Sequence, residues 1–161
     1  MRAGDVPNFD ELFRHEYPTI VRTVYLMLGE REAAEEAAQE AFLELYIHWR
    51  KVSRYDKPGA WVRRVAIRRA SRVRKHRRLE LQGSVPEMIG GGEDDVAIRL
   101  VVLTLPVAQR AAVVLRYFEQ LSTTDIAHLM DCSEATVRVH LHRARKRLGA
   151  LLGEEVADAA R

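Results

Sequence analysis

The side chains best suited to chemistry in this chain are the basic ones between residues 133 and 148. At about 100° per residue of helix, one arc of this stretch is apolar and must face a core. That arc comprises Val137, Leu141, Ala144 and Leu148. The opposite arc, with Arg138 at its edge, carries Val139, His142, Arg143 and Lys146. Cations around one exposed apolar side chain suit the major groove of DNA, where phosphates, guanine edges and thymine methyl groups need partners.

A second short helix and a tight turn precede this basic helix. Ser122 is a good N-cap residue, and Asp125 three positions later completes a capping box. Ser133 is a second N-cap and begins the basic helix. Two short helices with a tight turn, the second one basic, are typical of a helix-turn-helix that binds DNA. The alternative is a solvated helix end whose cations complement the helix dipole, which explains Arg147 but not the outward-facing Val139.

Charge is segregated along the chain, although the formal net charge is a modest +3. Residues 30–44 contain six glutamates and one arginine, whereas residues 57–79 contain ten lysines and arginines and no acid. Blocks of one sign indicate binding to a partner of the opposite sign. The pattern therefore predicts a basic partner for the acidic block and a polyanionic partner for the basic block.

Helical periodicity runs through nearly the whole chain, so we predict an all-α fold. Capping residues, glycines and Pro58 place the first three helices at residues 8–29, at residues 30–51 and from residue 58 through Val73. Two further helices, at residues 96–104 and 107–118, lead into the helix-turn-helix. These helices supply the framework that must hold the acidic and basic side chains in place.

A segment rich in glycine and acids, residues 81–95, has the composition of a flexible linker. It separates two small helical domains, residues 8–80 and residues 96–152. We expect a three-helix bundle in the first domain and the helix-turn-helix in the second.

Several function classes conflict with the composition. Cys132 is the single cysteine, which excludes an internal disulfide and a cysteine zinc cluster and fits a reducing cytoplasm. The sequence holds no apolar run of membrane-spanning length and no hydrophobic signal core, so we expect a cytoplasmic protein without membrane contact.

A helical di-metal hydrolase built on the acidic block and His48 would need Glu-x-x-His pairs, which the sequence lacks. We therefore expect no enzyme activity, no metal and no cofactor.

Short motifs along the chain are similar, in order, to those of a known family. They are Glu35-Glu-Ala-Ala-Gln-Glu-Ala-Phe42, Trp61-Val-Arg-Arg-Val-Ala66, Leu105-Pro-Val-Ala-Gln-Arg110, Asp125-Ile-Ala, Thr136-Val-Arg and His142-Arg-Ala-Arg145. With them the chain resembles the bacterial RNA polymerase sigma factors of the extracytoplasmic-function group, in the sigma-70 family. Members of that group keep conserved regions two and four, and the resemblance covers nearly the whole chain.

The resemblance implies a protein that binds core RNA polymerase and directs promoter-specific transcription initiation. The implied partners are the clamp helices of the largest polymerase subunit, the flap of the beta subunit, promoter DNA and an anti-sigma protein. Contacts with core polymerase would come from the acidic block, through Glu36, Gln39, Glu40 and Glu44. The alternative for these residues is an ordinary solvated helix face.

The resemblance also divides promoter recognition between the two domains. It assigns the minus-35 element to the basic helix, through Arg138, Val139, His142, Arg143 and Lys146. It assigns minus-10 recognition and melting to the loop before the third helix and to that helix, through Ser53, Arg54, Tyr55, Lys57, Arg63, Arg64 and Arg68. Opened DNA needs a positive groove and a pocket for an unstacked base, and for Tyr55 both base stacking and simple packing stay open.

Some positions depart from the family's pattern. Arg68 stands where the family commonly has Asn, Arg72 where it often has Asp, and Val139-His140 replaces a frequent Ser-Arg. The family's base preferences therefore do not transfer directly. The other function class is a free-standing helix-turn-helix regulator, which explains residues 121–148 but gives the acidic helix, the arginine-rich helix and the linker no role.

Overall fold

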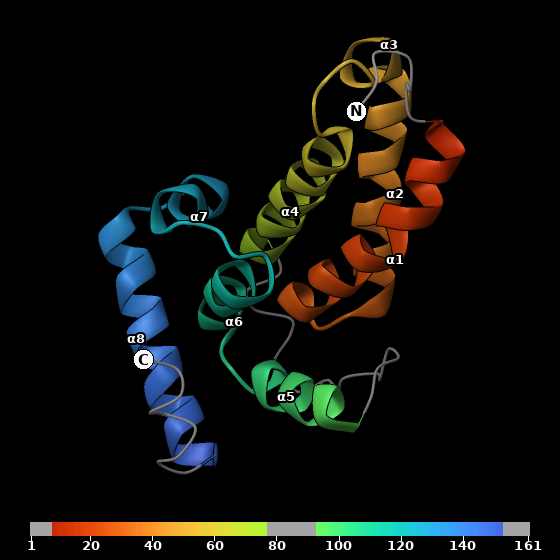
Figure 1. Ribbon diagram of the computed structural model, residues 1–161. Coiled ribbons are helices and arrows are strands. Elements are labelled where there is room, and N and C mark those ends of the chain that lie inside the picture. The colour runs from red at the N-terminus through yellow and green to blue at the C-terminus, as the bar shows by residue number, and fades with distance from the viewer. Residues whose placement is uncertain (1–7, 77–92, 153–161) are drawn as a thin grey trace.

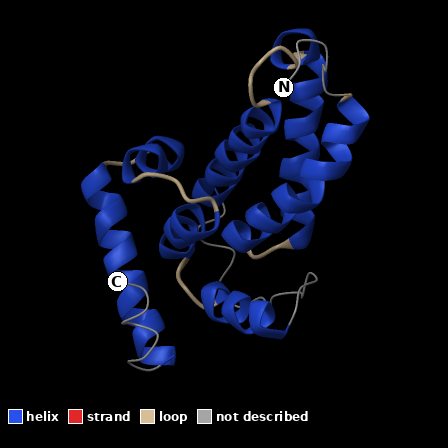
Figure 2. Ribbon diagram, viewed as in Figure 1, coloured by secondary structure: helices blue, strands red, loops and turns tan. Residues whose placement is uncertain are grey.

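A computed structural model describes residues 8–76 and 93–152 (Figure 1). Within these ranges the regular elements are all helical, which confirms the predicted all-α class (Figure 2). The elements are α1 Phe9–Leu28, α2 Arg31–Ile47, α3 Trp49–Val52, α4 Pro58–His76, α5 Glu93–Leu103, α6 Val107–Val113, the π-helix η1 Val114–Phe118, α7 Thr123–Met130 and α8 Glu134–Leu152. Most of the predicted 81–95 linker lies outside the described residues, and α5 begins within it.

The cap residues at both ends of α1 act as the sequence predicts. At the start, the Asn8 side chain accepts a hydrogen bond from the backbone N–H of Asp10 at 3.1 Å. At the end, Gly29 adopts a φ of +75°, a left-handed conformation that glycine reaches without steric cost. The last turn of α1 carries no basic side chain of its own. Arg110 of α6 supplies one, because its Nε donates to the Met27 carbonyl at 3.2 Å.

Arg110 also joins α1 to α5, since its Nη1 donates to the Leu103 carbonyl at 3.2 Å. Its side chain is buried, and this desolvation lowers the pKa of the guanidinium, while the electrostatic interaction with Tyr25 raises it. An arginine still keeps its charge at neutral pH. The C-termini of α1 and α5, each with a partial negative charge, therefore share one buried cation.

Helices α1, α2 and α4 pack pairwise into a bundle (Figure 1). Alanines of α2, among them Ala34, Ala38 and Ala41, are fully buried and let the helix axes approach closely. The predicted helix over residues 30–51 is wrong in one respect, because α2 ends at Ile47 and His48 leaves the helical region with φ −99° and ψ 13°. The chain then turns so that Trp49 packs edge-on against Phe9, with ring centroids 5.3 Å apart.

The second half of the chain contains α5 to α8. Here the predicted helix over residues 107–118 is α-helical only as far as Val113. It becomes a π-helix at Val114, as the backbone N–H of Glu119 bonds to the Val114 carbonyl at 3.1 Å. This wider turn keeps Val114 and Leu115 buried and leaves Tyr117 and Phe118 exposed. After η1 the chain continues into α7 and α8, which pack on each other.

The two halves pack against one another in addition to forming their own cores. Helix α6 and η1 lie against α1, and α7 lies against α4 (Figure 1). Buried apolar residues of the two halves belong to one continuous cluster. The sequence predicted two helical domains, and the structure adds an interface between them.

Candidate nucleic-acid interface

The helix-turn-helix is held together by side-chain caps at both of its helices. Ser122 accepts a hydrogen bond from the backbone N–H of Asp125 at 3.1 Å, and Ser133 accepts one from that of Thr136 at the same distance. Between them, Asp131 ends α7 in the left-handed conformation, with φ 54°. The Thr124 hydroxyl donates to the Glu134 carboxylate at 2.6 Å and ties the two helices together. The second helix is therefore fixed in direction relative to the first.

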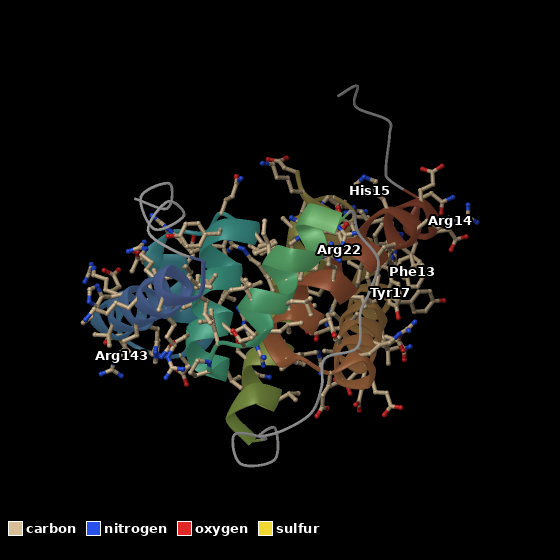
Figure 3. All side chains as sticks on the ribbon, turned by 90° about the horizontal axis from the view of Figure 1, so that it is seen from below. Phe13, Arg14, His15, Tyr17, Arg22 and Arg143 are labelled. Carbon is tan, nitrogen blue, oxygen red and sulfur yellow. The ribbon has the colours of Figure 1, made fainter. Side chains whose placement is uncertain are left out.

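Helix α8 exposes the side chains that the sequence predicts. Val137, Leu141 and Ala144 are buried, whereas Val139 is 45% exposed. We call the outward side of α8 the recognition face; it comprises Arg138, Val139, His142, Arg143 and Lys146, which are all exposed. Figure 3 shows Arg143 on the outer side of α8, at the opposite end of the molecule from the side chains of Phe13 and Tyr17. A cationic face with one apolar side chain is thus open to a large ligand.

A second basic surface lies at the turn between α3 and α4. Arg50, Lys51, Arg54 and Tyr55 line an open hollow of about 500 Å³, which we call the basic hollow. Tyr55 is 40% exposed and its ring is accessible from solvent. Ser53 and Lys57 belong to the same turn, half-buried and exposed respectively. Three cations around an accessible aromatic ring can hold a phosphate backbone and stack on an unpaired base.

The sequence prediction for this hollow missed Arg50 and Lys51. They precede the predicted loop and fall within the predicted helix over residues 30–51, whereas α3 is a short separate turn. The signal that could have found them is the basic run Arg50-Lys51 followed by Arg54, which one helical turn brings to the same side.

The arginines of α4 divide into two groups. Arg64 and Arg68 are exposed and add positive charge to the surface of α4. Arg63 points inward instead: its Nη2 donates to the Glu16 carboxylate at 2.8 Å, and its Nη1 lies 3.7 Å from the Glu119 carboxylate. The sequence predicted these arginines as one group, and the structure brings Arg63 to two carboxylates of other elements.

The acidic side chains gather on the exposed side of α2. We call Glu36, Gln39, Glu40 and Glu44 the acidic face; the first three are exposed and Glu44 is half-buried. Arg69 of α4 donates to Glu40 at 2.8 Å and to Glu44 at 2.9 Å. A groove of about 250 Å³ between α2 and α4 is lined by Glu36, Glu40, Arg69 and Arg72 with small apolar neighbours.

Exposed apolar side chains continue the acidic face toward the end of α2. Leu43, Tyr46 and Ile47 are 61%, 67% and 69% exposed. The sequence prediction did not include them, although Leu43 and Ile47 are spaced one turn apart and follow Gln39 and Glu40 along the helix. An exposed apolar strip beside acids is typical of a surface that binds another protein.

Within the described residues, neither a metal-binding group of side chains nor a membrane-length helix occurs. Residues 8–76 and 93–152 hold no group of three or more His, Cys, Asp or Glu side chains placed to bind a metal ion. Among the described helices, none combines the length and the apolar character needed to cross a bilayer.

Comparison with family models finds two matching ranges in the chain. Residues 12–79 match the model of Sigma-70 region 2, and residues 95–148 match that of Sigma-70, region 4. The acidic face and the basic hollow lie in the first range, and the recognition face lies in the second.

Relatives that match nearly the full chain are named RNA polymerase sigma factors. The ECF RNA polymerase sigma factor SigM of Mycobacterium tuberculosis is 32% identical over 158 residues, which cover 94% of this chain and 80% of the relative. A second SigM, from Bacillus subtilis, is 32% identical over 163 residues, or 92% of this chain and 98% of the relative. The RNA polymerase sigma-E factor of Streptomyces coelicolor is 30% identical over 97% of this chain and 92% of its own length.

A solved structure shares the fold. It is the sigma factor RpoE in complex with the anti-sigma factor NepR from Bartonella quintana, which aligns with a TM-score of 0.63 and 20% identity. The alignment covers 89% of this chain and 96% of the other.

Proposed function

Because this chain belongs to the extracytoplasmic-function (ECF) group of the sigma-70 family, which binds core RNA polymerase and directs initiation at specific promoters, we propose how its surfaces divide that work. Residues 8–80 and 96–152 are the two functional domains, and residues 81–95 connect them. The matched ranges 12–79 and 95–148 support these boundaries.

The recognition face of α8 binds the minus-35 element. Its Ser-capped helix-turn-helix fixes α8 at the outside of the molecule, as a reader of the major groove requires. We assign Arg143 to a guanine edge, Val139 to a thymine methyl group, and Arg138, His142 and Lys146 to the neighbouring bases and phosphates, since all five side chains are exposed. The 45% exposure of Val139 among cations is the observation that carries this assignment, because a merely solvated helix gains nothing from an outward valine.

The basic hollow and the outer side of α4 bind the minus-10 element. Tyr55 stacks on an unpaired base, while Arg54, Lys57 and the adjoining Arg50 and Lys51 hold the backbone of the opened strand. Ser53 offers a hydroxyl at the rim, and Arg64 and Arg68 extend the positive surface along α4. Arg63 belongs to the same set, and in this structure its guanidinium is bonded to Glu16 and lies 3.7 Å from Glu119.

The acidic face of α2 binds the basic clamp helices of the largest polymerase subunit. Glu36, Gln39 and Glu40 provide the polar contacts, Glu44 lies at the edge, and the apolar strip of Leu43, Tyr46 and Ile47 supplies buried area. The second domain meets the flap of the beta subunit.

The setting of the protein follows from these roles. We place it in the cytoplasm, where the polymerase and the promoters are, and assign it no catalytic step or cofactor. RpoE is bound to the anti-sigma factor NepR in its solved complex, and an anti-sigma protein is the further class of partner that we propose for this chain.

The deciding experiment is transcription from a randomised promoter library with purified core polymerase. Core polymerase with the chain should select promoters that carry two conserved elements, and core polymerase without the chain should select none. Tight sequence-specific binding by the chain without polymerase, with no selection in the transcription assay, would instead identify a free-standing regulator.

A further inference from the structure

Arg138 of the recognition face is held in place by another side chain. Its Nη2 donates to Oε2 of Glu134, one turn earlier on α8, at 3.2 Å. Glu134 is in turn held from outside α8, because its Oε1 accepts a hydrogen bond from the Thr124 hydroxyl of α7 at 2.6 Å. The two oxygens of one carboxylate thus bond to different helices. We call the chain of Thr124, Glu134 and Arg138 the arginine brace.

The brace limits the orientations of the Glu134 carboxylate. A glutamate at the exposed start of a helix otherwise exchanges between several rotamers. Here α7 packs on α8 (Figure 1), and the Ser122 cap fixes the first turn of α7. Thr124 therefore holds Oε1, and the second oxygen is directed toward Arg138. Contacts between two helices, and not the conformation of α8 alone, decide where the carboxylate lies.

Arg138 keeps most of its capacity to bind DNA in this contact. The bond to Glu134 uses one of the five N–H donors of the guanidinium, and the arginine side chain is 63% exposed. A pair of parallel donors therefore remains for a partner with two acceptors side by side. In the major groove guanine presents such a pair, O6 and N7.

The carboxylate also disfavours phosphate as the partner of Arg138. Part of the arginine charge is neutralised by Glu134, so the guanidinium gains less from a second anion. A guanine edge is neutral, and two donors can reach it while the bond to Glu134 persists. A side chain that is already oriented also loses less conformational freedom when it binds.

We propose that Glu134 and Thr124 are positioning residues, which direct Arg138 to a guanine of the minus-35 element and keep it from the phosphates. Arg138 is then a specificity-determining residue in addition to Arg143. The proposal rests on the proposed function of α8. Glu134 acts without touching DNA, because both of its oxygens are bonded within the chain.

Nuclear magnetic resonance of the free chain tests the brace without reference to function. The Nε–H order parameter of Arg138, from ¹⁵N relaxation, should fall in Glu134→Ala and to a smaller extent in Thr124→Val. Thr123→Val makes the same chemical change at the neighbouring residue of α7 and is the matched control. It should leave the order of Arg138 unchanged.

Base preference of the polymerase holoenzyme tests the contact with DNA. On promoters with single substitutions in the minus-35 element, Arg138→Ala should lose about fivefold or more of the preference for guanine at one position. Glu134→Ala should lose about two- to fivefold at the same position, the range of an exposed ion pair, and Thr124→Val less. Preference at the base pair assigned to Arg143 should not change, whereas a displaced α8 would alter both positions.

Two further effects of Glu134→Ala distinguish positioning from loss of structure. The substitution removes a negative charge near DNA, so binding to all promoters should tighten while base preference falls. The released Arg138 should contact phosphate, and the salt dependence of binding should become steeper by up to about one phosphate contact. Loss of helical structure would instead weaken binding to every promoter.

A double substitution separates action through Arg138 from a direct contact. Combined with Arg138→Ala, Glu134→Ala should have no further effect on base preference. A loss that persists in the Arg138→Ala background, at a cytosine, would show that Glu134 contacts a base itself and would overturn the positioning role. Unchanged order of Arg138 and unchanged base preference in Glu134→Ala would overturn it as well.

Failure of the proposed function has a different signature. If Arg138→Ala and Arg143→Ala both leave minus-35 preference unchanged while Glu134→Ala mobilises Arg138, the brace exists but α8 does not read this element. That result would reject the proposed function of α8, and with it the role of Arg138 on DNA. Loss of preference in Arg143→Ala, with none in Arg138→Ala, would keep the proposed function and reject the positioning role.

Discussion

Arg69 donates from its Nη1 to the carboxylate of Glu40 at 2.8 Å and so joins the arginine-rich helix α4 to the acidic helix α2. Its Nη2 bonds to Glu44 at 2.9 Å in the same way. Two carboxylates of the acidic face are therefore partly neutralised within the chain, whereas Glu36 is exposed one turn away. The members of this face should not be equivalent.

The first prediction concerns this difference. Glu36→Lys should weaken association with core polymerase and leave thermal stability unchanged, because it places a cation against basic clamp residues. Glu40→Lys should weaken association and also lower stability, since Arg69 loses a partner in a half-exposed pair worth about 0 to 1 kcal/mol and faces a like charge instead. Competition for core polymerase and thermal unfolding measure the two effects. Glu11→Lys is the control, and full competition by Glu36→Lys would remove this residue from the docking surface.

The second prediction separates base contacts from phosphate contacts on α8. Arg143→Ala should cost about 1 to 3 kcal/mol of discrimination at one position of the minus-35 element, and Val139→Ala should cost less, because it loses a methyl contact. Lys146→Ala should weaken all promoters alike if it meets phosphate. Transcription from promoters with single substitutions in each element is the measurement. Arg147→Ala, on the same helix but outside the recognition face, should change little, and a shift in minus-10 preference by Arg143→Ala would contradict the assignment.

The third prediction concerns the basic hollow. Tyr55→Ala should impair opening of the minus-10 element, because stacking of a base on an aromatic ring is worth about 1 to 3 kcal/mol, whereas Tyr55→Phe should retain it. Binding of forked DNA with an unpaired minus-10 strand measures the effect. Arg50→Ala and Lys51→Ala should reduce the salt dependence of binding without altering base preference. Equal losses in Tyr55→Ala and Tyr55→Phe would indicate a role for the hydroxyl and not for stacking.

The fourth prediction is that a glycine-to-alanine substitution in helix α4 destabilises the protein, opposite to the usual effect. Replacing glycine by alanine inside a helix normally stabilises by about 0.5 to 1 kcal/mol. At Gly59 of α4, however, an added Cβ would lie 2.7 Å from Oε1 of Glu16 and displace the carboxylate that holds Arg63. Gly59→Ala should therefore lower the free energy of unfolding by about 1 to 3 kcal/mol, as overpacking does.

A second background tests the cause of that loss. In Glu16→Ala the space beside Gly59 is open, so Gly59→Ala should there be neutral or stabilising, and the two substitutions should be strongly non-additive. Urea unfolding of the four proteins gives the coupling energy. Additive losses would show that the contact with Glu16 is not the reason.

Local sequence signals predicted the helices well because caps and periodicity act within a few residues. Asn8, Gly29, Ser122 and Ser133 each occupy the helix boundary expected of them. The break at His48 was missed because it depends on Trp49 packing against Phe9, forty residues away along the chain. Tertiary contacts of this kind leave no periodic pattern.

The candidate surfaces were predictable to the extent that helix geometry decides exposure. Burial of Val137 and exposure of Val139 follow from the angle between them. The partners of Arg63 and Arg69 were not predictable, since arginines on one helix look alike until other helices are packed around them. The π-helix η1 was missed as well, because its sequence has the apolar spacing of an ordinary helix.

The packing of α7 on α4 has a consequence for how the protein unfolds. Buried apolar residues of both halves belong to one cluster, so loss of packing in one half also exposes apolar surface of the other. Thermal unfolding should therefore be a single cooperative transition for the whole chain. A core substitution in either half should lower the same midpoint temperature.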